Sequence, residues 1–132
     1  MGHTITLAVA GAVAFMVLDG VWLGLLMKNF YRDQLAPIVR LADGGIAPNW
    51  PAAFVVYLLL GTGMALFVIP RASTISLAAA YGALFGLVVY GVYDFTNYST
   101  LRQWPFALTL ADTTWGSLAS AAAAVAVRIV AR

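Results

Sequence analysis

The fold of this chain is organised around the stretch Tyr90-Gly-Val-Tyr-Asp-Phe-Thr-Asn-Tyr-Ser-Thr-Leu-Arg-Gln-Trp-Pro105. This stretch joins two very apolar runs, and its middle holds polar side chains among aromatic rings. A long apolar run that ends in such a polar turn is typical of a transmembrane helix. We therefore expect two antiparallel spanning helices that meet at this turn.

The composition indicates that the solvent of this protein is lipid. Of the 132 residues, 63% are hydrophobic and only 9% are charged, whereas about 25% of the residues of a soluble domain are charged. The formal net charge of +2, without a basic run or a Gly-rich phosphate loop, excludes nucleic acid as an expected partner. Cysteine is absent, which excludes disulfides, thiolate metal sites and a thiol nucleophile.

Four apolar runs predict four spanning helices, at about residues 4–27, 52–69, 75–93 and 106–127. Pro51 and Pro105 open the second and fourth helices, because proline at the first helical position loses no hydrogen bond. The first run is not a signal peptide, since it lacks a basic start and continues past any cleavage site. We predict an all-α integral membrane protein, an antiparallel four-helix bundle that forms a single domain over residues 1–132.

The long connection between the first two spans contains a short amphipathic segment, residues 31–41. Four spans place both termini on one face of the membrane, which we call side A. The connection 28–50 and the turn 94–104 lie on the opposite face, side B. Arginine and lysine are nearly balanced between the faces, but the arginines of side A stand without acids. We therefore expect the termini to be cytoplasmic.

Two Gly-x-x-x-Gly pairs, Gly20 with Gly24 and Gly82 with Gly86, predict close helix contacts. Such a pair can be a dimer seam, but ordinary packing inside the bundle is the favoured interpretation because the pattern is common in Gly/Ala-rich spans. The i+4 spacing continues from Gly86 through Tyr90 to Asp94, so this acid is expected to face other helices. Asp112 shares a face with small residues in the same way.

The topology brings three acids, Asp19, Asp94 and Asp112, to the side B half of the membrane. Asp19 and Asp112 each open an Asp-x-x-Trp motif, which sets an indole beside an acid at i+3. Carboxyl groups in a membrane are costly and indicate a functional site by default. The alternative is a structural role, in which a protonated aspartic acid donates a hydrogen bond across helices and Arg102 or Lys28 neutralises an acid that stays charged.

These observations predict an aromatic-lined site for a small or lipid-like ligand, such as a lipid or a pigment, in the side B half. No catalytic residue is assigned, because no histidine lies there to activate a hydroxyl. The lack of histidine also argues against a transition metal; a hard cation would accept oxygen ligands from the aspartates and Asn97, but no metal ligand is assigned. The identity of any cofactor stays open. The candidate ligand-binding residues are Asp19, Trp22, Tyr90, Asp94, Thr96, Asn97, Arg102, Asp112 and Trp115.

Several motifs together resemble the domain-of-unknown-function 2177 family of predicted bacterial membrane proteins: Leu18-Asp-Gly-Val-Trp-Leu-Gly24, Gly82-Ala-Leu-Phe-Gly86, Tyr93-Asp-Phe-Thr-Asn-Tyr-Ser-Thr-Leu101, Trp104-Pro105 and Asp112-Thr-Thr-Trp-Gly116. The resemblance covers nearly the whole chain, with Phe95 and Tyr98 standing where aliphatic residues are expected. It implies a bacterial inner-membrane protein. It supplies no established activity, so no catalytic residue is carried over. The family pattern falls on Asp19, Trp22, Asp94, Thr96, Asn97, Asp112 and Trp115.

Two other function classes remain beside the ligand binder. An accessory subunit would dock on a larger membrane complex, or on further copies of itself, through its Gly/Ala faces or its side B aromatics. A lipid-modifying enzyme would use Asp19 and Asp112 for proton transfer, but it lacks a nucleophile. A transporter requires an oligomer, since four short helices barely enclose a path. A stoichiometric partner on purification would indicate the subunit, and a retained lipid or pigment would indicate the binder.

Overall fold

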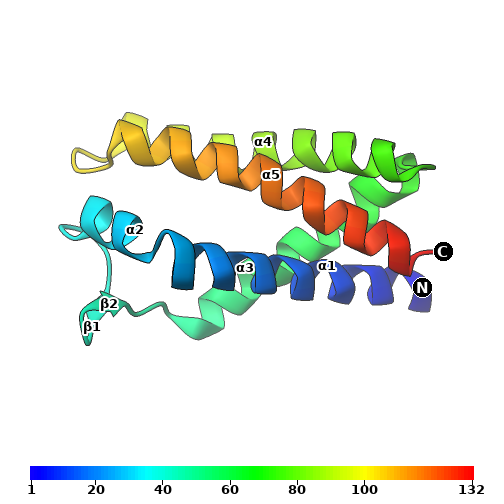
Figure 1. Ribbon diagram of the computed structural model, residues 1–132, viewed down its shortest axis with the longest axis horizontal. Coiled ribbons are helices and arrows are strands. Elements are labelled where there is room, and N and C mark those ends of the chain that lie inside the picture. Colours follow the sequence, from blue (N-terminus) through cyan, green and yellow to red (C-terminus); the bar gives the residue numbers. More distant parts are fainter.

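The computed structural model describes residues 1–132 and shows a bundle of long helices (Figure 1). α1 (Gly2–Val21) runs on through a π-helical turn (Trp22–Leu26) and is followed by α2 (Lys28–Leu35). A short hairpin of β1 (Leu41–Ala42) and β2 (Gly45–Ile46) leads to α3 (Trp50–Gly63), which continues as a π-helical turn (Met64–Val68) and a 3-10 turn (Ile69–Arg71). α4 (Ile75–Thr100) and α5 (Phe106–Val130) complete the chain.

Four of these helical segments are long and apolar enough to cross a membrane, which confirms the prediction of an all-α membrane protein. The shortest has 22 residues and extends about 33 Å at 1.5 Å per residue, enough for a hydrocarbon core of about 30 Å. The four segments are Gly2–Leu26, Trp50–Arg71, Ile75–Thr100 and Phe106–Val130.

Side-chain caps fix the start of two spans. The Asn49 side chain accepts a hydrogen bond from the Ala52 amide at 3.2 Å, and Pro51 follows at the first turn of α3. The Thr74 hydroxyl accepts from the Leu77 amide, also at 3.2 Å, at the start of α4. Each cap satisfies one amide that the first turn of a helix leaves free.

The predicted end of the third span, at Tyr93, is wrong. α4 continues to Thr100, so Asp94 lies inside the helix and not at a polar turn. The polar residues of this last part bond to their own helix, since the hydroxyls of Ser99 and Thr100 donate to the Thr96 carbonyl at 2.8 and 2.9 Å. No glycine or proline interrupts this part, and the local bonds occupy side chains that would otherwise favour a turn.

The amphipathic segment after the first span is a helix, but it begins and ends earlier than the predicted residues 31–41. α2 occupies residues 28–35, and Pro37 cannot continue it, because proline lacks an amide donor. The chain then turns through Asp43 and Gly44, whose φ angles are 51° and 76°. Positive φ at both central residues is what a two-residue hairpin turn of type I′ requires.

Two helical hairpins form the bundle. α4 packs along α5, α1 packs on α3, and α1 also packs on α5, which joins the two hairpins. The last turns of the second span, residues 64–71, contact α4. Figure 1 shows both termini at one end of the bundle, with α2 and the α4–α5 turn at the other. This arrangement agrees with the predicted sides A and B.

Glycine lets α4 approach α5 closely. A side chain at Gly86 would collide with the Gly116 carbonyl and with the Ser120 side chain, and one at Gly116 would collide with the Tyr90 ring. The pair Gly82 and Gly86 therefore lies inside the bundle, and it brings the following turns of α4, with Tyr90 and then Asp94, onto α5.

The other glycine pair does not pack in the bundle, so that prediction is wrong. A side chain at Gly20 or Gly24 would meet nothing within 4 Å. The close approach of α1 uses Gly11 instead, which faces Gly61 of α3. Gly20 faces away from the bundle because it lies about 100° round the helix from Asp19, whose side chain points into the bundle.

The apolar core lies in the middle and side A parts of the bundle. It contains Phe15, Met64, Val68 and Val127, each at most 2% exposed. Toward side B the buried positions are increasingly polar: they include Tyr31, Asp19, Asp94, Thr109 and Thr113. The packing of the fold thus leaves the side B half as the place where polar chemistry is concentrated.

A reporter fused after residue 45 and one fused after residue 132 should lie on opposite faces of the membrane. The reason is that three spans separate these positions. A phosphatase or a fluorescent protein, each active on one side only, measures the location. Reporters on the same face would contradict the four-span topology.

Gly86→Ala should destabilise the bundle, because the added methyl group meets backbone and a side chain of α5. Overpacking of this kind costs about 1–3 kcal/mol. The measurement is thermal unfolding in detergent. Gly20→Ala is the matched control and should be neutral or slightly stabilising, since its surroundings are open and alanine favours helix. Equal destabilisation by both variants would contradict the helix contact described here.

Candidate functional site: an aspartate–tryptophan network on side B

α1 turns Asp19 into the bundle. The buried residues of α1 include Leu7, Gly11, Phe15 and Asp19, which follow each other at i+4 and so lie on one face. The opposite face carries the exposed residues Val9, Val13, Val17 and Val21. Asp19 is only 8% exposed. An acid on the apolar inner stripe of a spanning helix needs a partner from another helix.

That partner is a tryptophan of α5. The Trp115 indole donates to Asp19 Oδ1 at 2.8 Å. Trp22 stacks on the same indole, with ring centroids 4.4 Å apart and the planes within 1° of parallel. The two Asp-x-x-Trp motifs therefore meet face to face, one from the first span and one from α5.

Tyr31 of α2 completes the contact between the two motifs. Its hydroxyl accepts a hydrogen bond from the Trp22 indole at 2.9 Å and donates to Asp112 Oδ1 at 2.6 Å. Each indole thus reaches the acid of the other motif. Trp115 donates directly to Asp19, and Trp22 is linked to Asp112 through the Tyr31 hydroxyl. The prediction placed each indole beside the acid of its own helix, and the hydrogen bonds instead cross between helices.

Tyr31 is the only buried residue of α2 and is 5% exposed. Burial raises the pKa of its hydroxyl above the ordinary range, and the nearby Asp112 carboxylate raises this pKa further. The hydroxyl therefore stays protonated and remains a donor to Asp112. Tyr31 is not among the site residues predicted from the sequence. The one signal was its place in an amphipathic segment, where a single ring on the apolar face can reach the bundle.

Asp94 is the most deeply buried of the three acids, with an exposed fraction of 0%. The Thr113 hydroxyl donates to its Oδ2 at a long 3.4 Å, and its Oδ1 is buried without a hydrogen-bond partner. The Asp94 and Asp112 carboxyl groups are neighbours. Tyr90 packs on Gly116 one turn before Asp94, and Tyr57 of α3 lies beside Asp19. Residues of all four spans and of α2 thus surround the acids.

No cation neutralises this network. The chain has one ion pair, between Arg32 and Asp33 on α2, and it lies outside the network. The expectation that Arg102 or Lys28 serves as counter-ion is therefore wrong. The reason is position, because the Lys28 side chain lies beside Gly45 in the hairpin and Arg102 lies in the exposed turn after α4. No three acidic or histidine side chains converge closely enough to hold a metal ion.

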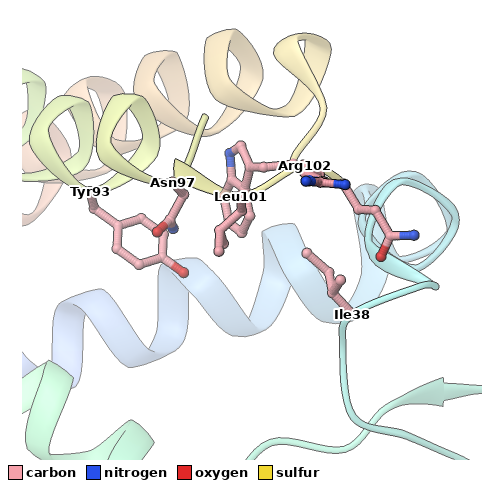
Figure 2. A pocket seen from close by; sticks show the side chains of 7 residues that line it. Ile38, Tyr93, Asn97, Leu101 and Arg102 are labelled. Carbon is pink, nitrogen blue, oxygen red and sulfur yellow. The ribbon is translucent and has the colours of Figure 1, made fainter. Parts of the chain in front are cut away.

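Two predicted site residues, Asn97 and Arg102, lie together in a different place. They line an open pocket of about 620 Å³ between the end of α4 and the connection after α2 (Figure 2). Thr96 is exposed and lines neither the pocket nor the network. The structure thus divides the predicted residues into a deep network and a surface pocket. The network holds Asp19, Trp22, Tyr90, Asp94, Asp112 and Trp115.

The fold and the buried network define a multi-pass membrane protein of four helices with acids and indoles gathered at one end. The chain belongs to the domain-of-unknown-function 2177 family, since the family model described as "Predicted membrane protein (DUF2177)" matches residues 4–129. No curated protein and no solved structure matches the chain.

Tyr31→Phe should destabilise the protein, because it leaves the Trp22 indole without its hydrogen-bond acceptor and removes the hydroxyl that donates to Asp112. A buried polar group left unpaired costs about 1–3 kcal/mol. Thermal unfolding in detergent measures the effect. Tyr98→Phe is the matched control, since the Tyr98 ring is half exposed and removal of its hydroxyl should change the stability little. Equal stability of Tyr31→Phe and the wild type would show that α2 does not complete the network.

Proposed function

We propose that the protein binds a small or lipid-like ligand, such as a lipid or a pigment, at the aspartate–tryptophan network of side B. The observation that carries this proposal is that the carboxyl groups of the site have no cationic partner and too few hydrogen-bond donors within the chain. Three carboxyl groups from three helices lie in one half of the membrane without an ion pair, and one buried oxygen, Asp94 Oδ1, has no hydrogen-bond partner. Such groups are expensive in a membrane and are retained where they serve a function.

The hydrogen-bond inventory supports a ligand that carries donors. An ionised carboxylate is an acceptor only and can take several hydrogen bonds. Within the chain, Asp19 accepts from Trp115 and has the Tyr57 hydroxyl beside it. Asp112 accepts from Tyr31, and Asp94 accepts weakly from Thr113 and lies next to Asp112. An amine or a hydroxyl group on the ligand would supply the missing donors. A cationic amine would also neutralise charge, which no side chain of the protein does here.

An apolar groove beside the network supports the lipid-like character of this ligand. The groove has a volume of about 500 Å³ and runs between the end of the first span and the first half of α5. Trp22 and Trp115 line it, and the same indoles donate toward the acids. A ligand with a hydrocarbon chain in the groove and a polar group at the acids would use both sides of the indole pair. Other residues lining the groove include Met27, Phe30, Leu110 and Leu118.

The site would act in the inner membrane of a bacterium, with both termini in the cytoplasm. The support is the family membership and the distribution of charge. Arg71, Arg128 and Arg132 of side A stand without acids, whereas the basic residues of side B are mixed with Asp33 and Asp43. Cytoplasmic loops favour basic residues. In this orientation the network would lie in the outer half of the membrane.

Native mass spectrometry of the detergent-solubilised protein tests the proposal. The wild type should carry an adduct with the mass of a lipid or a pigment. Asp94→Asn should bind it about 10–100-fold more weakly, which corresponds to the loss of a charge-assisted hydrogen bond of about 1.5–3 kcal/mol. Asp43→Asn is the matched control, because Asp43 is an exposed acid of the hairpin and asparagine accepts its positive φ.

Two outcomes would contradict ligand binding at this site. The first is an adduct that Asp94→Asn and Asp43→Asn retain equally, since the ligand would then lie elsewhere. The second is a preparation without a small-molecule adduct but with a second protein in fixed stoichiometry, which would favour an accessory subunit.

A further inference from the structure

The pocket on the side B surface differs in character from the acidic network. It lies between the last turns of α4, the turn 101–105 and the connection after α2, and has a volume of about 620 Å³. Figure 2 shows the side chains of Tyr93, Asn97 and Leu101 on one side of it and Ile38 across from them, with Arg102 at the turn. The residues that line the pocket are Ile38, Tyr93, Asn97, Leu101, Arg102, Gln103 and Trp104.

The polar groups of this pocket are chiefly hydrogen-bond donors. Arg102 supplies a guanidinium, and Asn97 and Gln103 supply amide NH₂ groups. None of the lining residues is acidic, and Arg102 forms no ion pair within the chain. A guanidinium accompanied by amide donors and free of carboxylates favours an anion with several acceptor oxygens.

Trp104 points to the same kind of ligand. Its indole nitrogen is buried and has no hydrogen-bond partner, although the tryptophan indole is a donor that normally finds one when it is buried. Tyr93 holds the ring by an edge-to-face contact, with centroids 5.7 Å apart and planes at 87°. The position of the ring is thus fixed, and its N–H is a donor that has no acceptor within the chain.

The location of the pocket identifies the source of the anion. The turn that carries Arg102 connects two membrane spans, one ending at Thr100 and the next beginning at Phe106. It therefore lies at the level of the lipid headgroups, where arginine and tryptophan meet phosphate. The pocket walls, Ile38, Leu101 and the Tyr93 and Trp104 rings, are apolar. They match the glycerol and upper chain region of a phospholipid.

We propose that this pocket binds the phosphate group of a phospholipid headgroup, with Arg102 as the charged contact and Trp104 as a neutral donor. None of the three acids lines it, so the assignment does not rest on a ligand in the deep network. The bound lipid would tie the α4–α5 turn to the connection after α2, which are otherwise separate parts of side B.

Native mass spectrometry of the full chain in detergent tests this assignment with three probes: a short-chain phosphatidylglycerol, a diacylglycerol of the same chain length, and inorganic phosphate. The phosphatidylglycerol should bind and the diacylglycerol should not. Arg102→Gln should weaken phosphatidylglycerol binding about tenfold or more, because it removes the charge that pairs with phosphate. Trp104→Phe should weaken it severalfold, because it keeps a ring but removes the N–H donor.

Arg40→Gln is the matched control, since Arg40 is an exposed arginine of side B that does not line the pocket. It should leave binding within about twofold of the wild type, as surface charges contribute little. Equal losses in Arg40→Gln and Arg102→Gln would overturn the proposal, because binding would then reflect the general charge of the surface. Equal binding of the diacylglycerol would overturn it as well.

Inorganic phosphate separates the two sources of the anion. If phosphate fails to displace the phosphatidylglycerol at equal concentration, the lipid headgroup is supported as the ligand. If phosphate displaces it there, and binds alone with the same dependence on Arg102, the free ion is the ligand and the assignment to a lipid is overturned.

Discussion

The side B half of this protein depends on one constraint: acids buried among membrane-spanning helices have no cation of the chain beside them. Lipid offers no hydrogen bonds, so each carboxyl group must be satisfied from within the protein. The solution is an exchange between two helices, in which Trp115 donates to Asp19 and Trp22 donates, through Tyr31, toward Asp112. This exchange fixes the register of the first span against α5, because a shift by one residue would turn both indoles away from the acids. The stacked indoles then form a common wall between the polar interior and the apolar groove.

Close helix packing decides how deep the third acid lies. Gly86 and Gly116 allow α4 to lie directly on α5, and Tyr90 fits over Gly116 in the next turn. The following turn carries Asp94 into full burial against Thr113. A larger residue at either glycine would lift α4 away from α5 and expose the carboxyl group to lipid. The small residues therefore bring the helices together and also bury the acid of the polar network. The apolar core lies toward the other end of the bundle, where the buried positions hold no acid.

The sequence was sufficient to predict the four spans, since apolar length alone decides them, and topology alone placed the acids in one half of the membrane. It was insufficient wherever a tertiary contact or a local bond decides. The polar residues after Tyr93 resemble a turn, yet their hydroxyls bond within α4 and extend it by seven residues. The partner of each indole could not be derived from i+3 spacing, because a neighbouring helix offers the acid at the better position. Tyr31 was missed since nothing in a short amphipathic segment tells how that segment docks on the bundle. Gly20 and Gly24 have the spacing of a packing pair but face outward, whereas the close contact uses Gly11 and Gly61.

The extension of α4 also explains how two regions of opposite character lie so near each other. Asp94 and Asn97 are three residues apart and therefore lie one above the other on α4, but Asp94 belongs to the buried acids and Asn97 to the donor-rich pocket. Tyr93 lies near both regions, because its ring packs on Trp104, its hydroxyl lies beside Asn97, and Asp94 and Asp112 are close to it. The last two turns of α4 thus lead from Asp94, which lies among the buried acids, to Arg102, which lies at the surface of the membrane. A guanidinium at the surface attracts anions there, whereas the buried carboxyl groups accept hydrogen bonds from donors in the interior. An occupant of either region would change the electrostatic potential of the other, since Tyr93 lies near both Asn97 and the acids and charges interact strongly in a medium of low dielectric.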